Sequence, residues 1–142
     1  MPRAADEKRG STRKRAQKKP SPKRPAVGAK AEATLCAYAL SMPGAVEEFP
    51  WGHRVAKVHK KIFVTFGNEE RAFSMSVKLP RSAAIALTLP FAEPTGYGLG
   101  KSGWITARFE PNERPPLDLL RAWIDESYRA IAPAKLVATL DA

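Results

Sequence analysis

The chain has 142 residues, of which 44% are hydrophobic and 27% charged, and its formal net charge is +10. This length and apolar content predict one hydrophobic core and exclude two domains of ordinary size. No stretch reaches the ~20 apolar residues of a membrane span, and the single cysteine, Cys36, excludes an intramolecular disulfide, so we expect a protein of the cytoplasm.

The positive charge is concentrated at the N-terminus. Residues 1–30 hold 11 Lys or Arg against two acidic residues, a net charge of +9, whereas residues 31–142 hold 13 basic and 12 acidic residues, a net charge of +1. Up to about Gly28 there is no aromatic residue, and Lys, Arg, Pro, Ser and Ala dominate. Such a segment buries too little apolar surface to offset the entropy lost on ordering. We therefore expect a disordered basic arm over residues 1–30 and a folded domain over residues 31–142.

The arm is a candidate nucleic-acid contact. Cations on a Pro- and Ser-rich segment can adapt to a phosphate backbone without a fixed shape. Each neutralised phosphate contributes about −0.9 to the slope of log affinity against log salt, so ~6 contacts would give a slope near −5. A nuclear-import signal and a solubilising tail are the alternatives for the same pattern. The basic clusters of the arm are Arg13, Lys14, Arg15, Lys18, Lys19, Lys23 and Arg24.

The folded part opens with a predicted helix over residues 31–41. Leu35 and Met42 recur there at helical spacing, and Pro43 and Gly44 end the helix.

Hydrophobic residues then alternate with polar ones, which is typical of strands. We expect strands over residues 47–51 and 54–58, and a hairpin of residues 62–66 and 71–79 whose turn is Gly67-Asn68. The alternation places Phe73, Met75, Val77 and Leu79 on one face, and it groups Ile62, Val64 and Phe66 opposite Phe63 and Thr65.

The C-terminal half returns to helices after one more strand. Residues 81–87 predict a short helix, residues 96–100 a glycine-rich loop, and residues 104–109 a strand. Residues 117–131 predict the strongest helix, which Pro133 ends before a short helix over residues 134–140. The apolar stripe of the long helix is Leu117, Leu120, Ile124, Tyr128 and Ile131. This order predicts a two-layer α+β domain, with helices on one face of an antiparallel sheet and the other face partly open.

Few residues of the domain have the spacing of a catalytic or cofactor site. Residues 100–102 read Gly-Lys-Ser, the end of a phosphate-binding P-loop, but Thr95 replaces the first glycine and a strand follows in place of a helix. The two histidines, His53 and His59, form no metal spacing with Cys36. We therefore expect neither a metal nor a cofactor.

Ser127 and Tyr128 lie on the long helix, where a packing role outweighs catalysis, because no nucleophile of the chain has a recognisable base partner. We therefore expect that the protein is not an enzyme.

The folded part resembles the MmcQ/YjbR family from about Ala33 to Leu140. The short motifs that carry the resemblance occur in the family's order: Pro43-Gly44, Glu47 and Glu48, Pro50-Trp51-Gly52, Lys57-Val58, Lys61-Ile62-Phe63, Trp104 and Ser127-Tyr128. The resemblance implies a small CyaY-like α+β fold and DNA binding, because the shape of these proteins resembles a double-wing module. The chain departs from the better-known branch at Gly98-Leu99-Gly100-Lys101, where that branch has a His-Met-Asn-Lys-like stretch. Only Lys101 and Trp104 carry over there.

The function expected from the sequence is that of a non-enzymatic, DNA-binding protein of the MmcQ/YjbR type, with DNA rather than RNA as its partner and no membrane contact. The alternative is a small-ligand or protein-binding module that uses the open sheet face near Trp51 and Trp104. Lysines 60 and 61 belong at a hairpin tip, in the position of a wing. The candidate nucleic-acid contacts of the domain are Lys57, Lys60, Lys61, Lys78, Lys101, Trp104 and Arg108.

Overall fold

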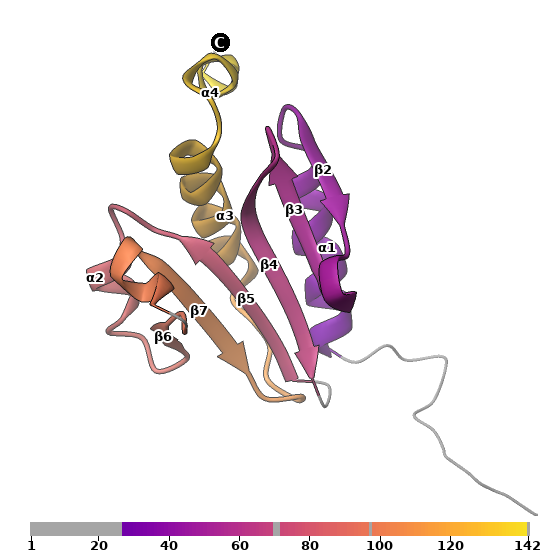
Figure 1. Cartoon of the computed structure of the whole chain (residues 1–142). Coiled ribbons are helices and arrows are strands. Elements are labelled where there is room, and N and C mark those ends of the chain that lie inside the picture. The colour runs from indigo at the N-terminus through magenta and orange to yellow at the C-terminus, as the bar shows by residue number, and fades with distance from the viewer. Residues whose placement is uncertain (1–26, 70–71, 97, 142) are drawn as a thin grey trace, which may run out of the picture.

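The computed structural model describes residues 27–69, 72–96 and 98–141. The seven basic residues predicted as contacts of the arm lie outside this part. The described chain forms one antiparallel sheet with the strand order β2-β3-β4-β5-β7-β6 (Figure 1). Its strands are β2 (Ala45–Glu48), β3 (Arg54–Val58), β4 (Lys61–Glu69), β5 (Ala72–Lys78), β6 (Ala92–Pro94) and β7 (Trp104–Phe109).

The two long helices cover one face of the sheet. α1 packs against β3, β4 and β5, and α3 packs against β4, β5 and α1, so both lie behind the sheet in Figure 1. The predicted two-layer α+β fold is thus confirmed. Within the described ranges, no helix combines the length and hydropathy needed to cross a membrane. The helices are α1 (Val27–Leu40), α2 (Ala83–Ala86), α3 (Leu117–Ile131) and α4 (Ala134–Leu140), and short 3₁₀ turns are η2 (Pro50–Gly52) and η3 (Leu99–Ser102).

The strand alternation decides which side chains reach the core. In β5 the residues Phe73, Met75 and Val77 are buried, as predicted, and they lie opposite Phe109, Ala107 and Ile105 of β7. The intervening residues of both strands therefore face away from the helices. We call that side of the sheet the open face.

A β-bulge changes the predicted alternation of β4. Ala56 pairs with Val64, but Lys57 pairs with Ile62, so Phe63 is an extra residue in the ladder. Phe63 and Val64 are both fully buried, and Ile62 is left on the open face. The prediction that Ile62 shares a face with Val64 is wrong, because a bulge inverts the alternation on one side of itself.

Three further elements differ from the sequence-based expectation. Gly67 and Asn68 are not the hairpin turn, since they pair with Ser74 and Phe73 inside the ladder. α1 begins at Val27, four residues earlier than predicted. The edge strand β6 was not predicted because Pro94 lies in it, and an edge strand tolerates a proline that a central strand excludes.

The serine of α3 fastens the helix to the sheet. The Oγ of Ser127 donates a hydrogen bond to the carbonyl oxygen of Phe63 (2.5 Å) and accepts one from the backbone N–H of Lys78 (2.9 Å). The bulge leaves the Phe63 carbonyl without its ladder partner, so this bond satisfies a buried acceptor. Ser127 and Tyr128 are both fully buried. The structural role predicted for this pair is what the structure shows.

Candidate nucleic-acid interface

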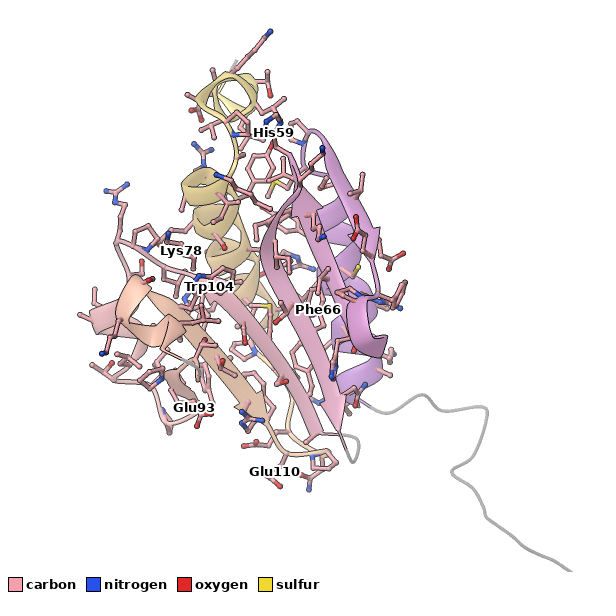
Figure 2. The ribbon with its side chains drawn as sticks, viewed as in Figure 1. His59, Phe66, Lys78, Glu93, Trp104 and Glu110 are labelled. Atoms are coloured by element: carbon pink, nitrogen blue, oxygen red, sulfur yellow. The ribbon has the colours of Figure 1, made fainter. Side chains whose placement is uncertain are left out.

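The open face gathers basic side chains that the sequence spreads over 52 positions. Lys57, Lys78 and Arg108 lie on this face by strand register, because their neighbours on each strand are buried under the helices. Lys78 lies directly across from Trp104 on the adjacent strand, and Figure 2 shows both on this face. Lys60 and Lys61 line a hollow with Lys57 and Trp104.

Two of these five cations are paired with carboxylates. The Nζ of Lys57 lies 2.9 Å from Glu48 Oε1, and an Nη of Arg108 lies 3.0 Å from Glu93 Oε2. Even with Glu69, which the strand register places on the same side across from Ala72, the basic residues of this face outnumber the acidic ones, although residues 31–142 as a whole carry only +1. The positive charge of the domain is therefore concentrated where no long helix covers the sheet.

The loop between β3 and β4 presents two of these lysines. His59 and Lys60 both adopt positive φ, 53° and 69°, as the central residues of a tight type I′ turn do. Such a turn continues the right-handed twist of the two strands, so the hairpin projects as a compact tip. Lys60 and Lys61 are exposed at that tip, in the wing position predicted from the sequence.

Two adjoining hollows run along the open face. One, of about 520 Å³, extends to Pro50, Gly67 and Arg108, and the other, of about 510 Å³, extends to the lysines of the β3–β4 hairpin and to Trp104. They share Ile62, Thr65, Ser76 and Thr95, so together they form one continuous depression, which we call the groove.

A chain of hydroxyl groups lies at the middle of the groove. The Oγ1 of Thr106 is 2.7 Å from the Oγ of Ser76 and 2.9 Å from the Oγ1 of Thr95, so one strand residue links the other two. Thr65 lies across from Ser76 and lines the groove as well. The groove thus has cations at its ends and neutral, rotatable donors and acceptors at its centre.

The glycine-rich loop adds one more predicted residue beside the groove. Gly98 and Gly103 adopt positive φ on either side of η3, which carries the exposed Lys101. Leu99 of the same turn lines the groove next to Trp104. Because η3 leads into strand β7 and not into a helix, residues 100–102 do not form the phosphate cradle of a P-loop.

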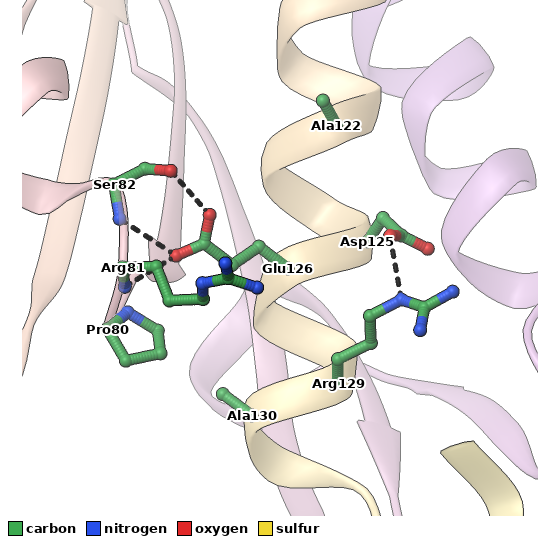
Figure 3. Close-up of a pocket in the computed structure, with 8 residues that line it drawn as sticks. All are labelled: Pro80, Arg81, Ser82, Ala122, Asp125, Glu126, Arg129 and Ala130. Carbon is green, nitrogen blue, oxygen red and sulfur yellow. Dashed lines mark hydrogen bonds and ion pairs between the residues drawn. The ribbon is translucent and has the colours of Figure 1, made fainter. Parts of the chain in front are cut away.

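A larger hollow, of about 650 Å³, lies between α3 and the turn that precedes α2 (Figure 3). The Glu126 carboxylate that lines this hollow already accepts hydrogen bonds from the protein. Glu126 accepts hydrogen bonds from the backbone N–H groups of Arg81 (2.8 Å) and Ser82 (3.0 Å) and from the Ser82 hydroxyl (2.6 Å). Glu126 therefore caps the turn and holds it against α3, which is a structural role.

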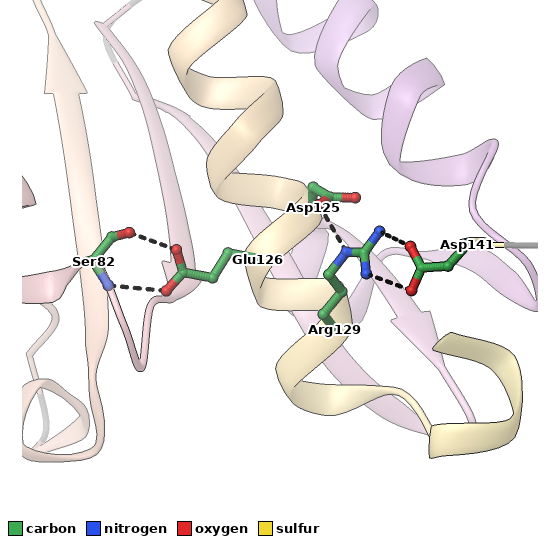
Figure 4. A network of polar contacts seen from close by, with 5 residues as sticks. All are labelled: Ser82, Asp125, Glu126, Arg129 and Asp141. Carbon is green, nitrogen blue, oxygen red and sulfur yellow. Dashed lines mark hydrogen bonds and ion pairs between the residues drawn. The ribbon is translucent and has the colours of Figure 1, made fainter. Parts of the chain in front are cut away.

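Two other charged side chains of that hollow, those of Asp125 and Arg129, belong to a network that fastens α4. Arg129 contacts Asp125 through Nε (2.9 Å) and Asp141 through both terminal nitrogens (3.3 and 3.1 Å), as Figure 4 shows. The Arg129 guanidinium lowers the pKa of the Asp141 carboxyl below its ordinary value, mainly by hydrogen bonding. These contacts join the end of α4 to α3 and leave little free charge for a ligand.

The single cysteine lies apart from the groove, between α1 and β2. Cys36 is 2% exposed, and its Sγ lies 3.6 Å from Glu47 Oε2. Burial raises the pKa of the Cys36 thiol. Among the described residues, no three His, Cys, Asp or Glu side chains are arranged to hold a metal ion.

The sequence identified the cations and Trp104 of the open face, and the structure brings six of the seven predicted domain residues to the groove or to its rim, with Lys101 beside it. The sequence patterns did not identify the hydroxyl chain. Ser76 and Thr106 occupy polar positions in strands where hydrophobic and polar residues alternate, so their place on the open face was predictable. Thr95 lies between a proline and a glycine in a segment that predicts only a loop.

The fold and the open face define a class: a small α+β protein with a six-stranded antiparallel sheet, two helices on one side and a cationic groove on the other. A model of the YjbR family matches residues 40–130, and the chain belongs to this family. The resemblance seen in the sequence is therefore confirmed.

One solved structure with the same fold is that of the Deinococcus radiodurans protein DR2400, which is described as a DUF419 domain. It is 22% identical, with a TM-score of 0.57, over 70% of this chain and 76% of that chain. At this identity the likeness concerns the fold alone. No curated protein sequence matches the chain.

Proposed function

We propose that the protein binds DNA without catalysing a reaction and that its contacts are largely sequence-independent. The observation that supports this most directly is the excess of basic over acidic residues on an open sheet face, around a groove that contains a partly exposed tryptophan. A cationic surface attracts the phosphate backbone, and an aromatic ring beside it gives a base a surface to stack on.

The basic arm adds a second source of phosphate contacts. Residues 1–30 carry a net charge of +9, well above the excess of basic residues on the open face. We therefore assign most of the non-specific affinity to Arg13, Lys14, Arg15 and the other basic clusters of this segment, and the orientation of the bound DNA to the open face. A cytoplasmic location belongs to the same proposal.

A small-molecule site is the second candidate function, and the size of the groove favours it. Each hollow, at about 510–520 Å³, has the volume of a typical ligand pocket. In that case the open face would bind its ligand at high salt and the arm would serve localisation or solubility. Salt dependence separates the two functions, because phosphate contacts weaken steeply as salt rises.

The test compares charge-neutralised variants of the full chain. Fluorescence anisotropy of a labelled 20-nucleotide DNA, as a single strand and as a duplex, is measured from low to high NaCl. The arm variant replaces the seven basic residues of the arm by Gln, and the face variant is Lys60→Gln with Lys61→Gln. We expect the arm variant to lose most of the salt slope and the face variant to reduce it by up to about 2, since about one phosphate contact is lost per cation.

A matched control removes two charges from the helix side. Lys135 and Arg114 are exposed there, Arg114 beside the start of α1, so Lys135→Gln with Arg114→Gln changes the net charge as the face variant does. Equal effects of the face and control variants would mean that the open face does not contact DNA. Absence of binding by the wild-type chain at low salt would contradict the proposed function.

A further inference from the structure

The groove on the open face has features that a duplex cannot use. A DNA duplex hides its base faces in the stack and offers phosphates and groove edges on a rigid, convex surface. The groove is concave, and its lining includes small residues of three adjacent strands, such as Gly67, Ser76 and Thr106. Gly67 contributes no side chain there, and an added Cβ would lie 2.5 Å from the Oγ of Ser74. At these positions the short side chains leave room for a thin, extended chain.

Trp104 stands at one side of this groove. It is the first residue of β7, it is partly exposed, and it lies between Leu99 of η3 and the cross-strand Lys78. An indole in this position offers its ring to a base that has left its stack, and a lysine next to it can meet the phosphate of the same nucleotide. A paired base in a duplex exposes no face for such stacking.

The hydroxyl chain supplies the complementary polar surface. Thr106, 6% exposed, holds Ser76 and Thr95 on either side, and both of these partly exposed hydroxyls line the groove. Each hydroxyl can donate one hydrogen bond and accept two, and its hydrogen rotates to suit the partner. Such groups pair with the edge of any base, so they favour unpaired bases without selecting a sequence. The lysines lie at the end of the groove, where a backbone would enter.

We infer that the groove is a single-strand site: unpaired DNA lies across β4, β5 and β7, with one base stacked on Trp104 and base edges on the Ser76–Thr106–Thr95 hydroxyls. This inference rests on the proposed function and names the form of DNA that the open face takes. The lysines of the β3–β4 hairpin then contact the backbone at one end of the groove, and Arg108 contacts it at the other.

The test uses the full chain and one mixed-sequence 15-nucleotide strand, alone and annealed to its complement. Affinities of the wild type are compared with those of Trp104→Leu, Trp104→Phe and Thr106→Val at one low salt concentration. We expect Trp104→Leu to weaken single-strand binding about tenfold, Trp104→Phe to restore most of it because a ring can still stack, and duplex affinity to change less than twofold in either. Thr106→Val, nearly isosteric, is expected to weaken single-strand binding about threefold.

Thermal unfolding shows that each variant is folded before it is compared, and Trp104→Phe remains informative if Trp104→Leu is not stable. A duplex bound as tightly as the single strand by the wild type, or equal losses on both forms in Trp104→Leu, would overturn the single-strand inference while leaving DNA binding intact. Failure of the wild type to bind either form would instead refute the proposed function.

Discussion

The hydroxyl of Tyr128 donates a 2.6 Å hydrogen bond to the carbonyl oxygen of Pro43, which lies 85 residues earlier in the chain. Pro43 is in the turn that joins α1 to β2, so this bond fastens the α1–β2 turn to the last turn of α3. The Tyr128 ring also packs edge-on against Phe63, with centroids 5.3 Å apart. Two motifs that carry the family resemblance, Pro43-Gly44 and Ser127-Tyr128, are thus parts of one structural contact.

Removal of this bond is expected to destabilise the protein without affecting DNA binding. Tyr128→Phe keeps the ring but leaves the Pro43 carbonyl unpaired, which costs about 1–2 kcal/mol in the free energy of unfolding. Urea denaturation measures the loss. The matched control is Tyr38→Phe on α1, since within the described residues the Tyr38 hydroxyl makes no hydrogen bond. Equal losses in the two variants would show that the Tyr128 hydroxyl stabilises nothing.

Ser127 has a larger predicted effect, because its small side chain serves two buried partners. Ser127→Ala leaves both the Phe63 carbonyl and the Lys78 N–H unpaired, and we expect a loss of about 2–4 kcal/mol. Ser41→Ala is the control, since the Ser41 hydroxyl makes one exposed bond to the Tyr38 carbonyl. A loss for Ser127→Ala no larger than that of the control would contradict the role of Ser127 as the link between α3 and the bulge.

The thiol of Cys36 is expected to be unreactive in the folded protein. Burial restricts access to it and raises its pKa, so the reactive thiolate is depleted. A thiol reagent such as 5,5′-dithiobis(2-nitrobenzoic acid) should label no cysteine in native buffer and one per chain in urea. Labelling of the folded chain at the rate of a free thiol would mean that the contact between α1 and β2 opens readily.

The attachment of α4 is expected to depend on pH. Arg129 lowers the pKa of Asp141 below its ordinary value of 3.8, so the ion pair stabilises the folded state fully above that value. The stabilisation is lost as the pH falls through the lower pKa of the folded state. Methyl resonances of Leu136 and Val137, followed by NMR from pH 6 to pH 2, report the release of α4. In Asp141→Asn the helix should already be loosened at pH 6, and an unchanged acid transition in this variant would exclude Asp141 as its cause.

Local sequence patterns determined the elements of this protein because each element depends on short-range periodicity. The alternation of residues 73–79 and 104–109 and the apolar stripe of residues 117–131 predict β5, β7 and α3, and the strand β3 and the helix α4 have the predicted bounds. The same patterns place Lys57, Lys78, Trp104 and Arg108 away from the core. The charge excess of residues 1–30 is likewise a property of composition alone.

The tertiary structure determined the features that depend on contacts between distant segments, which residue periodicity does not encode. The bulge at Phe63 reverses one strand's alternation, because the carbonyl of this residue finds its partner on α3, 64 residues away. The hydroxyl chain of the groove forms only because Ser76 of β5, Thr106 of β7 and Thr95, directly after β6, belong to segments whose order in the sheet differs from their order in the chain. Contacts between distant segments depend on strand order and register, and neither is encoded by the spacing of residues within one element.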